Sequence, residues 1–194
     1  MTESAFTLDG QHVSREAFYA AACDPRRAVV VEACAGAGKT WMLVSRIVRA
    51  LLEGAEPQQI LAITFTRKAA GEMRTRLAEW LREFAQLDHA AAVQELLMRG
   101  VDRKTAEAQA HGLTQLHERV LASGRAVEVR TFHAWFSQLL RAAPIELLTD
   151  LGLRPDMQLV EDLSDLKPAL MRRCQAASSH FCSAPRPRDM ARAR

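Results

Sequence analysis

The sequence predicts an α/β fold in which a parallel sheet is flanked by helices. Three short apolar runs, at residues 28–33, 60–65 and 127–131, alternate with longer stretches whose apolar residues recur at helical spacing. The first two runs are continuously apolar, which indicates strands buried on both faces, as in a parallel sheet. A glycine-containing loop, ACAGAGKT, lies between the first run and a long helical stretch. Strand, loop and helix in this order are typical of an α/β unit.

Composition places the chain among soluble globular proteins. Hydrophobic residues make up 48% and charged residues 25% of its 194 residues, which suits one ordinary domain with a core. The formal net charge of +3 permits an anionic partner without requiring one. The four cysteines lack metal-binding spacing, the first residues do not resemble a secretory signal, and no apolar run approaches the roughly 20 residues that span a bilayer. We therefore expect a cytoplasmic protein without a membrane partner.

The first half of the chain is expected to alternate helix and strand. Residues 14–22 have helical character and end before a proline, and the strand over 28–33 follows. Residues 41–52 place apolar side chains on one helical face and are closed by a glycine. A second strand is expected over 60–65. It is followed by a helix over 68–84, in which apolar residues recur with arginines between them.

The second half is expected to be mostly helical. Residues 88–124 are alanine-rich and polar, and a third short strand over 127–131 leads into a helix over 134–141 that stops before a proline. Residues 160–170 suit one further helix, interrupted near its end by a proline. The small, polar, arginine-rich residues 175–194 are predicted to be disordered.

The loop has the composition of a phosphate-binding loop. Its backbone N–H groups and the helix dipole behind it suit an anion, Lys39 can reach the β and γ phosphates of a nucleotide, and the Thr40 hydroxyl can coordinate Mg²⁺. Such a string can also arise by chance in a turn, but a β-branched run before it and an amphipathic helix after it favour phosphate binding. Cys34 is interpreted as a space-filler in preference to a redox switch. The predicted nucleotide site comprises Ala33, Cys34, Ala35, Gly36, Ala37, Gly38, Lys39, Thr40 and Trp41.

Two further motifs follow the second and third strands. The segment TFTRKAAGEMRTR begins at Thr64, and RTFHAWF begins at Arg130. Because ligands gather at the carboxyl ends of parallel strands, both motifs are expected at the same sheet edge as the phosphate loop. Chemistry alone favours Phe65 as a strand end inside the core, with DNA stacking as the alternative. His133 suits a structural or capping role as well as a functional one, and the apolar residues after it suit a core.

Together, ACAGAGKT, TFTRKAAGEMRTR and RTFHAWF resemble the first three conserved motifs of UvrD/RecB-type superfamily 1 DNA helicases, over roughly residues 12–142. The longer spacing between the second and third motifs is more similar to the RecB or AddA exonuclease–helicase subunits. In this family the phosphate loop characteristically begins with alanine, as it does here at Ala33. The second motif resembles FTxKAAxEMxxR throughout.

The resemblance implies a RecA-like P-loop fold with helical insertions, and an ATP-dependent DNA helicase that moves 3′ to 5′ in DNA repair or recombination. It implies that Lys39 and Thr40 serve catalysis by binding ATP phosphates and Mg²⁺, and that other helicase or nuclease subunits are partners. It also implies a single-stranded DNA track, to which we assign Phe65, Thr66, Arg67, Lys68, Thr131, Phe132 and His133.

Two positions depart from the family pattern. A glutamine upstream of the loop normally recognises adenine, but the local match places Ser14 in that position, while Gln11 is close by and out of register. Adenine recognition is therefore left open. Arg67 stands where asparagine is common, which keeps hydrogen-bond donors and adds a charge.

The acidic pair that such an enzyme needs for Mg²⁺ is not evident. The pair Glu161-Asp162 follows no apolar strand and is interpreted as an exposed helix end. Two hypotheses result: the N-terminal portion of a helicase, inactive alone, or a stand-alone P-loop module that binds nucleotide and regulates a partner. An unrelated P-loop kinase is a third. The irregular basic tail favours the first hypothesis.

Under that first hypothesis the chain divides at residue 150. Residues 1–150 would be the N-terminal part of the ATP-binding domain, and residues 151–194 the start of a helical subdomain with a disordered tail. A sheet without its neighbouring strands would expose an apolar edge and face. We therefore expect marginal stability or aggregation of the isolated chain.

Overall fold

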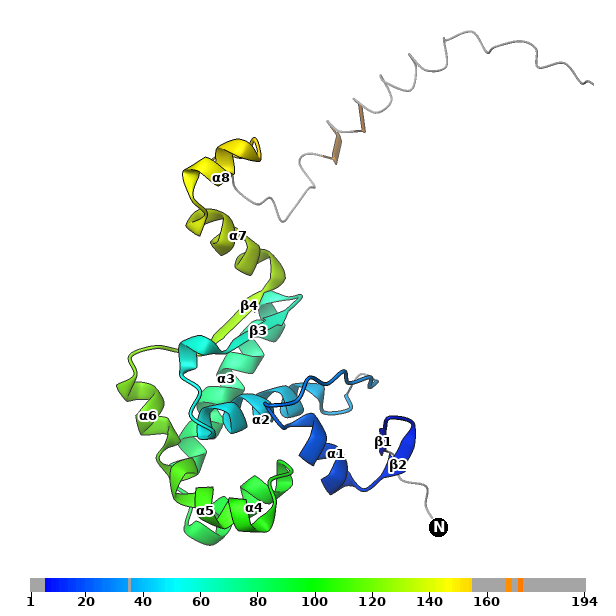
Figure 1. The fold of residues 1–194 in the computed structure, drawn as a ribbon, viewed down its shortest axis with the longest axis vertical. Helices are drawn as coiled ribbons and strands as arrows, with labels where there is room; N and C mark the ends of the chain where they lie inside the picture. Colours follow the sequence, from blue (N-terminus) through cyan, green and yellow to red (C-terminus); the bar gives the residue numbers. More distant parts are fainter. Residues whose placement is uncertain (1–5, 35, 155–166, 169–170, 173–194) are drawn as a thin grey trace, which may run out of the picture. The chain divides into compact units, whose positions relative to one another are not determined.

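The computed structural model describes residues 6–34, 36–154, 167–168 and 171–172, and the chain divides into two units, Met1–Trp135 and Phe136–Arg194. The elements of the first unit begin with a hairpin and end with a strand (Figure 1). In chain order they are β1 (Phe6–Leu8), β2 (Gln11–Val13), α1 (Arg15–Ala22), α2 (Lys39–Leu52), the 3₁₀ turn η1 (Pro57–Gln59), β3 (Leu61–Thr64), α3 (Arg67–Phe84), α4 (His89–Met98), α5 (Arg103–Thr114), α6 (Leu116–Ala122) and β4 (Glu128–Thr131). Helix α7 (Phe132–Ala142) continues from β4, and α8 (Ile145–Asp150) follows it.

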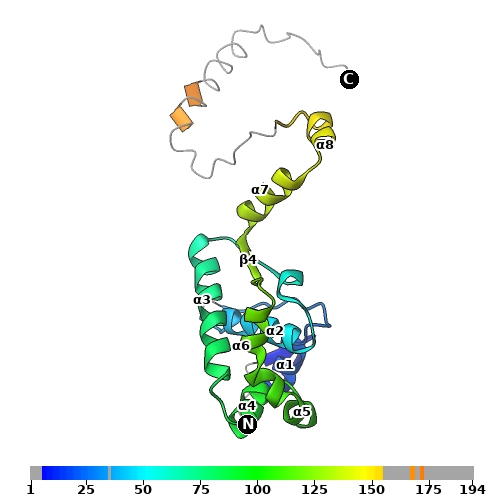
Figure 2. The same ribbon diagram turned by 90° about the vertical axis from the view of Figure 1, so that its left-hand side faces the viewer.

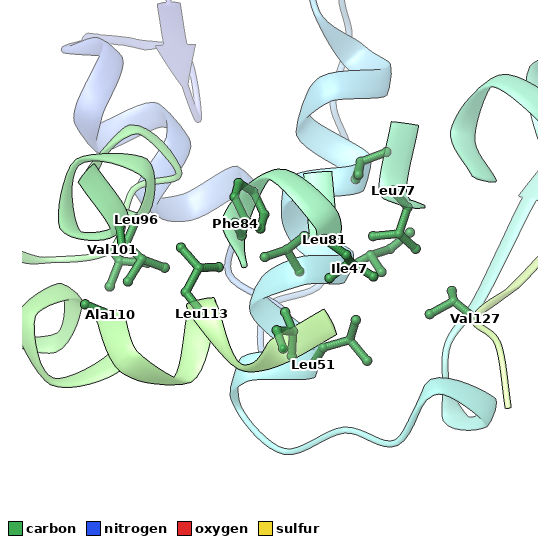
Figure 3. Close-up of a cluster of buried hydrophobic side chains, with 14 of the residues drawn as sticks. Ile47, Leu51, Leu77, Leu81, Phe84, Leu96, Val101, Ala110, Leu113 and Val127 are labelled. Atoms are coloured by element: carbon green, nitrogen blue, oxygen red, sulfur yellow. The ribbon is translucent and has the colours of Figure 1, made fainter. Parts of the chain in front are cut away.

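The core of the first unit is built by α2 to α6. Helix α2 buries one face, including Val44, Val48 and Leu51, and the same cluster contains Leu81 of α3 and Leu113 of α5 (Figure 3). Figure 2 shows α4 and α5 beside the C-terminal end of α3. Complete burial of such side chains contributes about 1.5–3 kcal/mol each relative to exposure. The helical face predicted from apolar spacing is therefore the face that packs.

Side chains cap the helices where the sequence predicts that they begin. Ser14, Thr66, Asp88 and Asp102 each accept a hydrogen bond from a backbone N–H in the first turn of α1, α3, α4 and α5. These caps satisfy N–H groups that have no partner within a helix. The predicted helices over 14–22, 41–52 and 68–84 are confirmed, and the helical character expected of residues 88–124 is found in α4, α5 and α6.

Strands β3 and β4 pair in parallel, with Thr64 opposite Thr131. One face of this small sheet is covered by α3, whose Arg74 donates a 2.8 Å hydrogen bond to the Val129 carbonyl. The other face exposes Leu61 by 42% and Ile63 by 39%. The prediction that this run is buried on both faces is therefore wrong, while the expectation of an uncovered apolar face agrees with the structure.

The strand expected over residues 28–33 is not formed. Val30 is completely exposed, and within the described part of the chain no strand pairs with this segment. A β-branched run becomes a strand only where another strand supplies hydrogen-bond partners for its backbone. Val31 packs against the small cluster of Ala22, Cys23 and Met42.

The hairpin β1–β2 was not predicted. Its strands are antiparallel, and Asp9 and Gly10 form the turn with φ angles of 50° and 80°. An Asp-Gly pair between two short alternating runs favours a two-residue turn of this kind, so the signal was present in the sequence. Phe6 of the hairpin packs on Phe18 of α1, with ring centroids 5.0 Å apart.

Helix α7 confirms the predicted helix over 134–141 but not its burial. No α7 residue is buried, and Phe136, Leu139 and Leu140 are 41–47% exposed, so the expectation that they and Trp135 form a core is wrong. Helix α8 was not predicted. Ala35, the pair Glu161-Asp162, most of the helix expected over 160–170 and the tail lie outside the described residues. Within the part of the chain described, no helix combines the length and apolar character needed to cross a membrane.

Candidate functional site

The glycine loop ends where α2 begins, and its backbone is left-handed at two glycines. Gly36 has φ 81° and Gly38, the N-cap of α2, has φ 83°. A Cβ at either position would meet no atom within 4 Å, so conformation and not space requires glycine here. Both glycines thus adopt a backbone conformation that other residues rarely adopt.

Lys39 folds back over the loop. Its Nζ donates hydrogen bonds of 2.7 Å to the Ala33 carbonyl and 2.6 Å to the Cys34 carbonyl. The Ala37 N–H in turn donates to the Cys34 carbonyl at 3.3 Å. The ammonium group is exposed, and among the described residues it is held by neutral oxygens and forms no ion pair, so an arriving anion can attract it.

The first turn of α2 presents backbone donors. Gly38 provides no side-chain cap, and the first backbone bond of the helix runs from the Met42 N–H to the Gly38 carbonyl at 3.0 Å. The N–H groups that precede Met42 thus have no partner in the helix. Together with the positive end of the helix dipole and Lys39, they form an electropositive site of the kind that binds phosphate.

Thr40 and Trp41 have different surroundings within this turn. Thr40 is half-buried in the first turn of α2. The Trp41 ring packs edge-on against Tyr19 of α1 and Trp80 of α3, at centroid distances of 5.1 Å and 5.9 Å. The aromatic ring of Trp41 is therefore part of the packing that supports the loop.

Arginines of α2 secure the segment that leads into the loop. Arg46 donates to the carbonyls of Ala22 and Pro25 at 3.3 Å and 3.4 Å, and also to that of Arg27. These bonds satisfy carbonyls at and beyond the C-terminus of α1, where a cation is favourable. The prediction from sequence did not identify Arg46, and a charged residue beside buried helical positions was its only signal.

Cys23 lies buried beneath this segment. It packs against Met42, and its burial raises the pKa of the thiol to about 11, although nearby arginines oppose the shift. Cys34, by contrast, is exposed in the loop. The two thiols therefore differ in accessibility, and the buried one remains protonated near neutral pH.

The second and third motifs meet at one edge of the β3–β4 sheet, as predicted. The parallel register places Thr64 opposite Thr131, so the residues that follow both strands lie at the same edge (Figure 1). Phe65 is 90% exposed, which excludes the interpretation that it ends the strand inside the core. Among the described residues the phosphate loop is not part of this sheet, because the strand expected over residues 28–33 is not formed. The expectation that both motifs share an edge with the phosphate loop is therefore wrong.

The hydroxyl groups of both motifs serve as helix caps. Thr66 accepts a 3.1 Å bond from the Ala69 N–H, and the buried Thr131 accepts a 3.2 Å bond from the Ala134 N–H. Phe132 is 46% exposed, and its ring lies 6.2 Å from that of Trp135. Two similar turns thus each hold a ring at the sheet edge while a threonine starts the next helix.

Charged residues accompany these rings. Arg67, Lys68 and His133 are exposed, and Lys68 makes a 4.0 Å contact with Glu72 one helical turn later. An exposed pair of this kind contributes little stability, so the Lys68 charge remains accessible to another anion. The edge therefore combines aromatic faces with cations.

The positions considered for adenine recognition have structural roles. The Ser14 hydroxyl accepts a 3.2 Å bond from the Ala17 N–H and caps α1. Gln11 lies in β2, opposite Leu8, and is exposed. Neither position is tied to the loop by a hydrogen bond among those that the structure records.

Comparison with known proteins identifies the family of the chain. The family model for the UvrD/REP helicase N-terminal domain matches residues 14–183. The AddA-type subunit of the ATP-dependent helicase/nuclease of Lactobacillus helveticus is 30% identical over 122 residues, which is 63% of this chain and 9% of that protein. The proteins of the same name from Latilactobacillus sakei and Levilactobacillus brevis are 39% and 41% identical over 36% and 39% of this chain.

This chain spans 9%, 8% and 6% of the length of those three relatives. The match nevertheless covers the phosphate loop, the β3–α3 turn and the β4–α7 turn together. The chain belongs to the UvrD/REP helicase N-terminal domain family.

Proposed function

We propose that this chain is the N-terminal part of the ATP-binding domain of a DNA helicase, with a RecA-like P-loop fold. The start of α2 carries the proposal, because a helix N-terminus without a side-chain cap, two left-handed glycines and Lys39 occur together there. This arrangement suits the phosphates of ATP. The relatives are named ATP-dependent enzymes, which favours ATP over other anions.

In this proposal the loop residues have separate roles. Backbone N–H groups of residues 33–41 orient the phosphates, and Lys39 moves from its two carbonyls to the β and γ phosphates. Thr40 supplies a hydroxyl ligand to Mg²⁺, which would neutralise phosphate charge. Trp41 serves the site by supporting the first turn of the helix.

We further propose that single-stranded DNA crosses the edge of the β3–β4 sheet. Phe65 and Phe132 offer exposed rings on which bases stack, and Arg67, Lys68 and His133 offer donors to the backbone. Thr66 and Thr131 would act mainly by holding the two turns, because their hydroxyls cap α3 and α7. Aromatic stacking with nearby cations tolerates any base sequence, as a translocating enzyme requires.

The wider assignment extends the family resemblance. Residues 1–150 would belong to the ATP-binding domain and residues 151–194 would begin a helical subdomain. The larger enzyme would move 3′ to 5′ on DNA and work with other helicase or nuclease subunits. Alone, the chain would bind ATP without appreciable hydrolysis, because its sequence presents no acidic pair after an apolar strand.

Nucleotide binding tests the central assignment. Calorimetry with Mg²⁺ and a non-hydrolysable ATP analogue should show binding that Lys39→Ala weakens about 10- to 100-fold, since a bond to a charged group contributes roughly 1.5–3 kcal/mol. Lys68→Ala, an exposed lysine on α3, is the matched control and should bind normally. Equal binding by wild type and Lys39→Ala would refute the phosphate site. Rapid hydrolysis that Lys39→Ala abolishes would instead refute only the proposed inactivity.

DNA binding tests the sheet edge separately. Fluorescence anisotropy with labelled oligothymidine should show at least about fivefold weaker binding for Phe65→Ala, because stacking contributes roughly 1–3 kcal/mol per base. Leu121→Ala removes a 66% exposed apolar side chain from α6 and should leave the affinity unchanged. A similar loss in both variants would mean that the rings at the edge are not a specific DNA surface.

A further inference from the structure

Arg99 is a charged residue in the core of the helical body, which is the part of the first unit built by α2 to α6. It is the C-cap of α4 and only 2% exposed, although arginine is rarely buried to this extent without a specific partner. It lies in the stretch between the second and third motifs and belongs to none of the three. A buried charge at such a position calls for a physical explanation.

Three aromatic rings and one carboxylate surround the guanidinium. Its central carbon lies 4.5 Å from the ring centre of Trp80, 4.8 Å from that of Phe84 and 5.4 Å from that of Trp41. Glu95, one turn earlier in α4, forms an ion pair with it. The Nε atom has no hydrogen-bond partner among the described residues, so ring faces supply much of the favourable environment.

The same residue contacts α2 through its backbone. The Arg99 carbonyl accepts a 3.3 Å bond from Arg49, whose guanidinium also bonds the Ala20 carbonyl of α1 at 3.5 Å. Trp41 lies in the first turn of α2, and Arg49 about two turns later. Arg99 therefore joins α4 to α2 at two levels, and one of them is the turn that presents the phosphate donors.

We infer that Arg99 is a positioning residue for the phosphate loop. Its guanidinium holds the Trp41 ring and thereby orders the first turn of α2 before nucleotide binds. The inference rests on the proposed nucleotide site for its functional consequence. A Cβ at Gly36 or Gly38 would meet no atom within 4 Å, so side-chain packing at these two positions does not hold the loop. The stack beneath Trp41 supplies the missing constraint, because a guanidinium on a ring face restricts the position of the ring.

The positioning role of Arg99 can be tested apart from its contribution to folding stability. Replacing a buried ion pair by an apolar side chain of similar volume is often neutral for folding. Arg99→Met keeps the volume, and Glu95 is partly exposed, so it is not left as a buried unpaired charge. We therefore expect a folded variant in which Trp41 has lost its cationic neighbour.

Hydrogen exchange on the free chain tests the inference directly. Arg99→Met should raise the exchange rates of the amides of residues 42–45 about tenfold, as expected when a desolvated cation–π contact is lost. Arg99→Lys should give an intermediate rise, because an ammonium group lacks the planar stacking of a guanidinium. Arg103→Met, at an exposed arginine paired with Glu107 on α5, is the surface control and should change nothing.

A core variant separates positioning from destabilisation. Leu113→Ala removes a fully buried side chain of α5 and should raise exchange throughout the core at a comparable or greater loss of stability. The inference is wrong if, at matched stability, Leu113→Ala raises the exchange rates of residues 42–45 as much as Arg99→Met does. It is also wrong if Arg99→Met leaves those rates unchanged.

Nucleotide affinity supplies the second measurement. With Mg²⁺ and the non-hydrolysable ATP analogue, Arg99→Met should bind about tenfold more weakly than wild type at equal thermal stability. If wild type itself binds no nucleotide, the proposed function fails, and the exchange data still decide whether Arg99 orders the helix. Unchanged affinity together with raised exchange would show that the ordering has no consequence for binding, which also contradicts the inference.

Discussion

Helix α2 and the loop segment that joins it to α1 are adjacent in the chain and both contain apolar runs, yet they differ in the contacts that fix them. Val44 and Val48 of α2 are fully buried among α3 and α5, whereas Val30 is fully exposed. Arg46 fixes the start of the segment, at Pro25 and Arg27, and Val31 is its one apolar anchor among the described residues. Between these two attachments and α2 the backbone follows no strand.

The contrast shows that apolar character determines burial only where a partner surface exists. A helix satisfies its own backbone, so α2 needs only side-chain neighbours, and α3 and α5 provide them. An extended segment needs another strand as well, and β3 and β4 pair only with each other among the described residues. The helical body is thus defined by its own packing, and the loop segment by a few attachments.

Alanine substitutions at two left-handed glycines, Gly100 in the helical body and Gly36 in the loop, should give the largest difference in the free energy of unfolding. A Cβ on Gly100 would lie 2.2 Å from the Ala20 backbone nitrogen, whereas one on Gly36 would meet nothing within 4 Å. Gly100→Ala adds a backbone clash to a strained conformation and should cost about 3–5 kcal/mol. Gly36→Ala should cost only about 1–2 kcal/mol.

Urea unfolding of both variants measures this difference. Gly71→Ala serves as a control, because a Cβ there meets nothing within 4 Å and the residue lies within α3. It should be neutral or slightly stabilising, since alanine favours the helix. If Gly36→Ala destabilised the chain as much as Gly100→Ala, the loop would be packed and the contrast would fail.

The buried thiol of Cys23 should give the next largest effect, which is a pH dependence of the free energy of unfolding. The folded state raises the pKa of Cys23 to about 11, so the unfolded chain loses this proton first as pH rises. The contribution of Cys23 to stability is therefore complete below about pH 9 and falls by up to roughly 2–3 kcal/mol as pH approaches about 11.

The free energy of unfolding, measured from pH 7 to about pH 10.5 for wild type and Cys23→Ala, isolates this contribution. Wild type should lose more stability over this interval than the variant. Cys34→Ala, at the exposed thiol of the loop, should retain the wild-type pH dependence. Parallel curves for wild type and Cys23→Ala would show that the thiol ionises freely and that the C-terminus of α1 is open to water.

A matched pair of valines gives the smallest effect. Val48→Ala should destabilise the chain by about 2 kcal/mol, because it removes buried methyl groups and leaves a cavity. Val30→Ala should change the free energy of unfolding by less than about 0.5 kcal/mol. Thermal denaturation of the two variants measures both losses of stability. If Val30→Ala destabilised the chain nearly as much as Val48→Ala, the loop segment would have a partner surface on which Val30 packs.

Much of the site could be predicted from local chemistry. The glycine loop at 33–40, the helix behind it and the two strand ends with Phe65 and Phe132 follow from residue types and spacing, and the register of β3 and β4 brings those ends together. The assignment of the loop to ATP and of the rings to DNA stays a prediction. Arg46, Arg49 and Arg99 were not predicted, because their carbonyl and ring partners lie 19–50 residues away in the chain or on another helix.

The sequence by itself determined the features that depend on near neighbours: where helices begin at Ser14, Thr66 and Asp88, which face of α2 is apolar, and where glycine permits a left-handed turn. These properties are set within about one helical turn of the chain. Only the tertiary structure decided that Val30 is exposed and that Arg99 is buried beneath Trp41. Burial depends on surfaces contributed by distant segments, and the chemistry of a single residue does not specify which surfaces will be present.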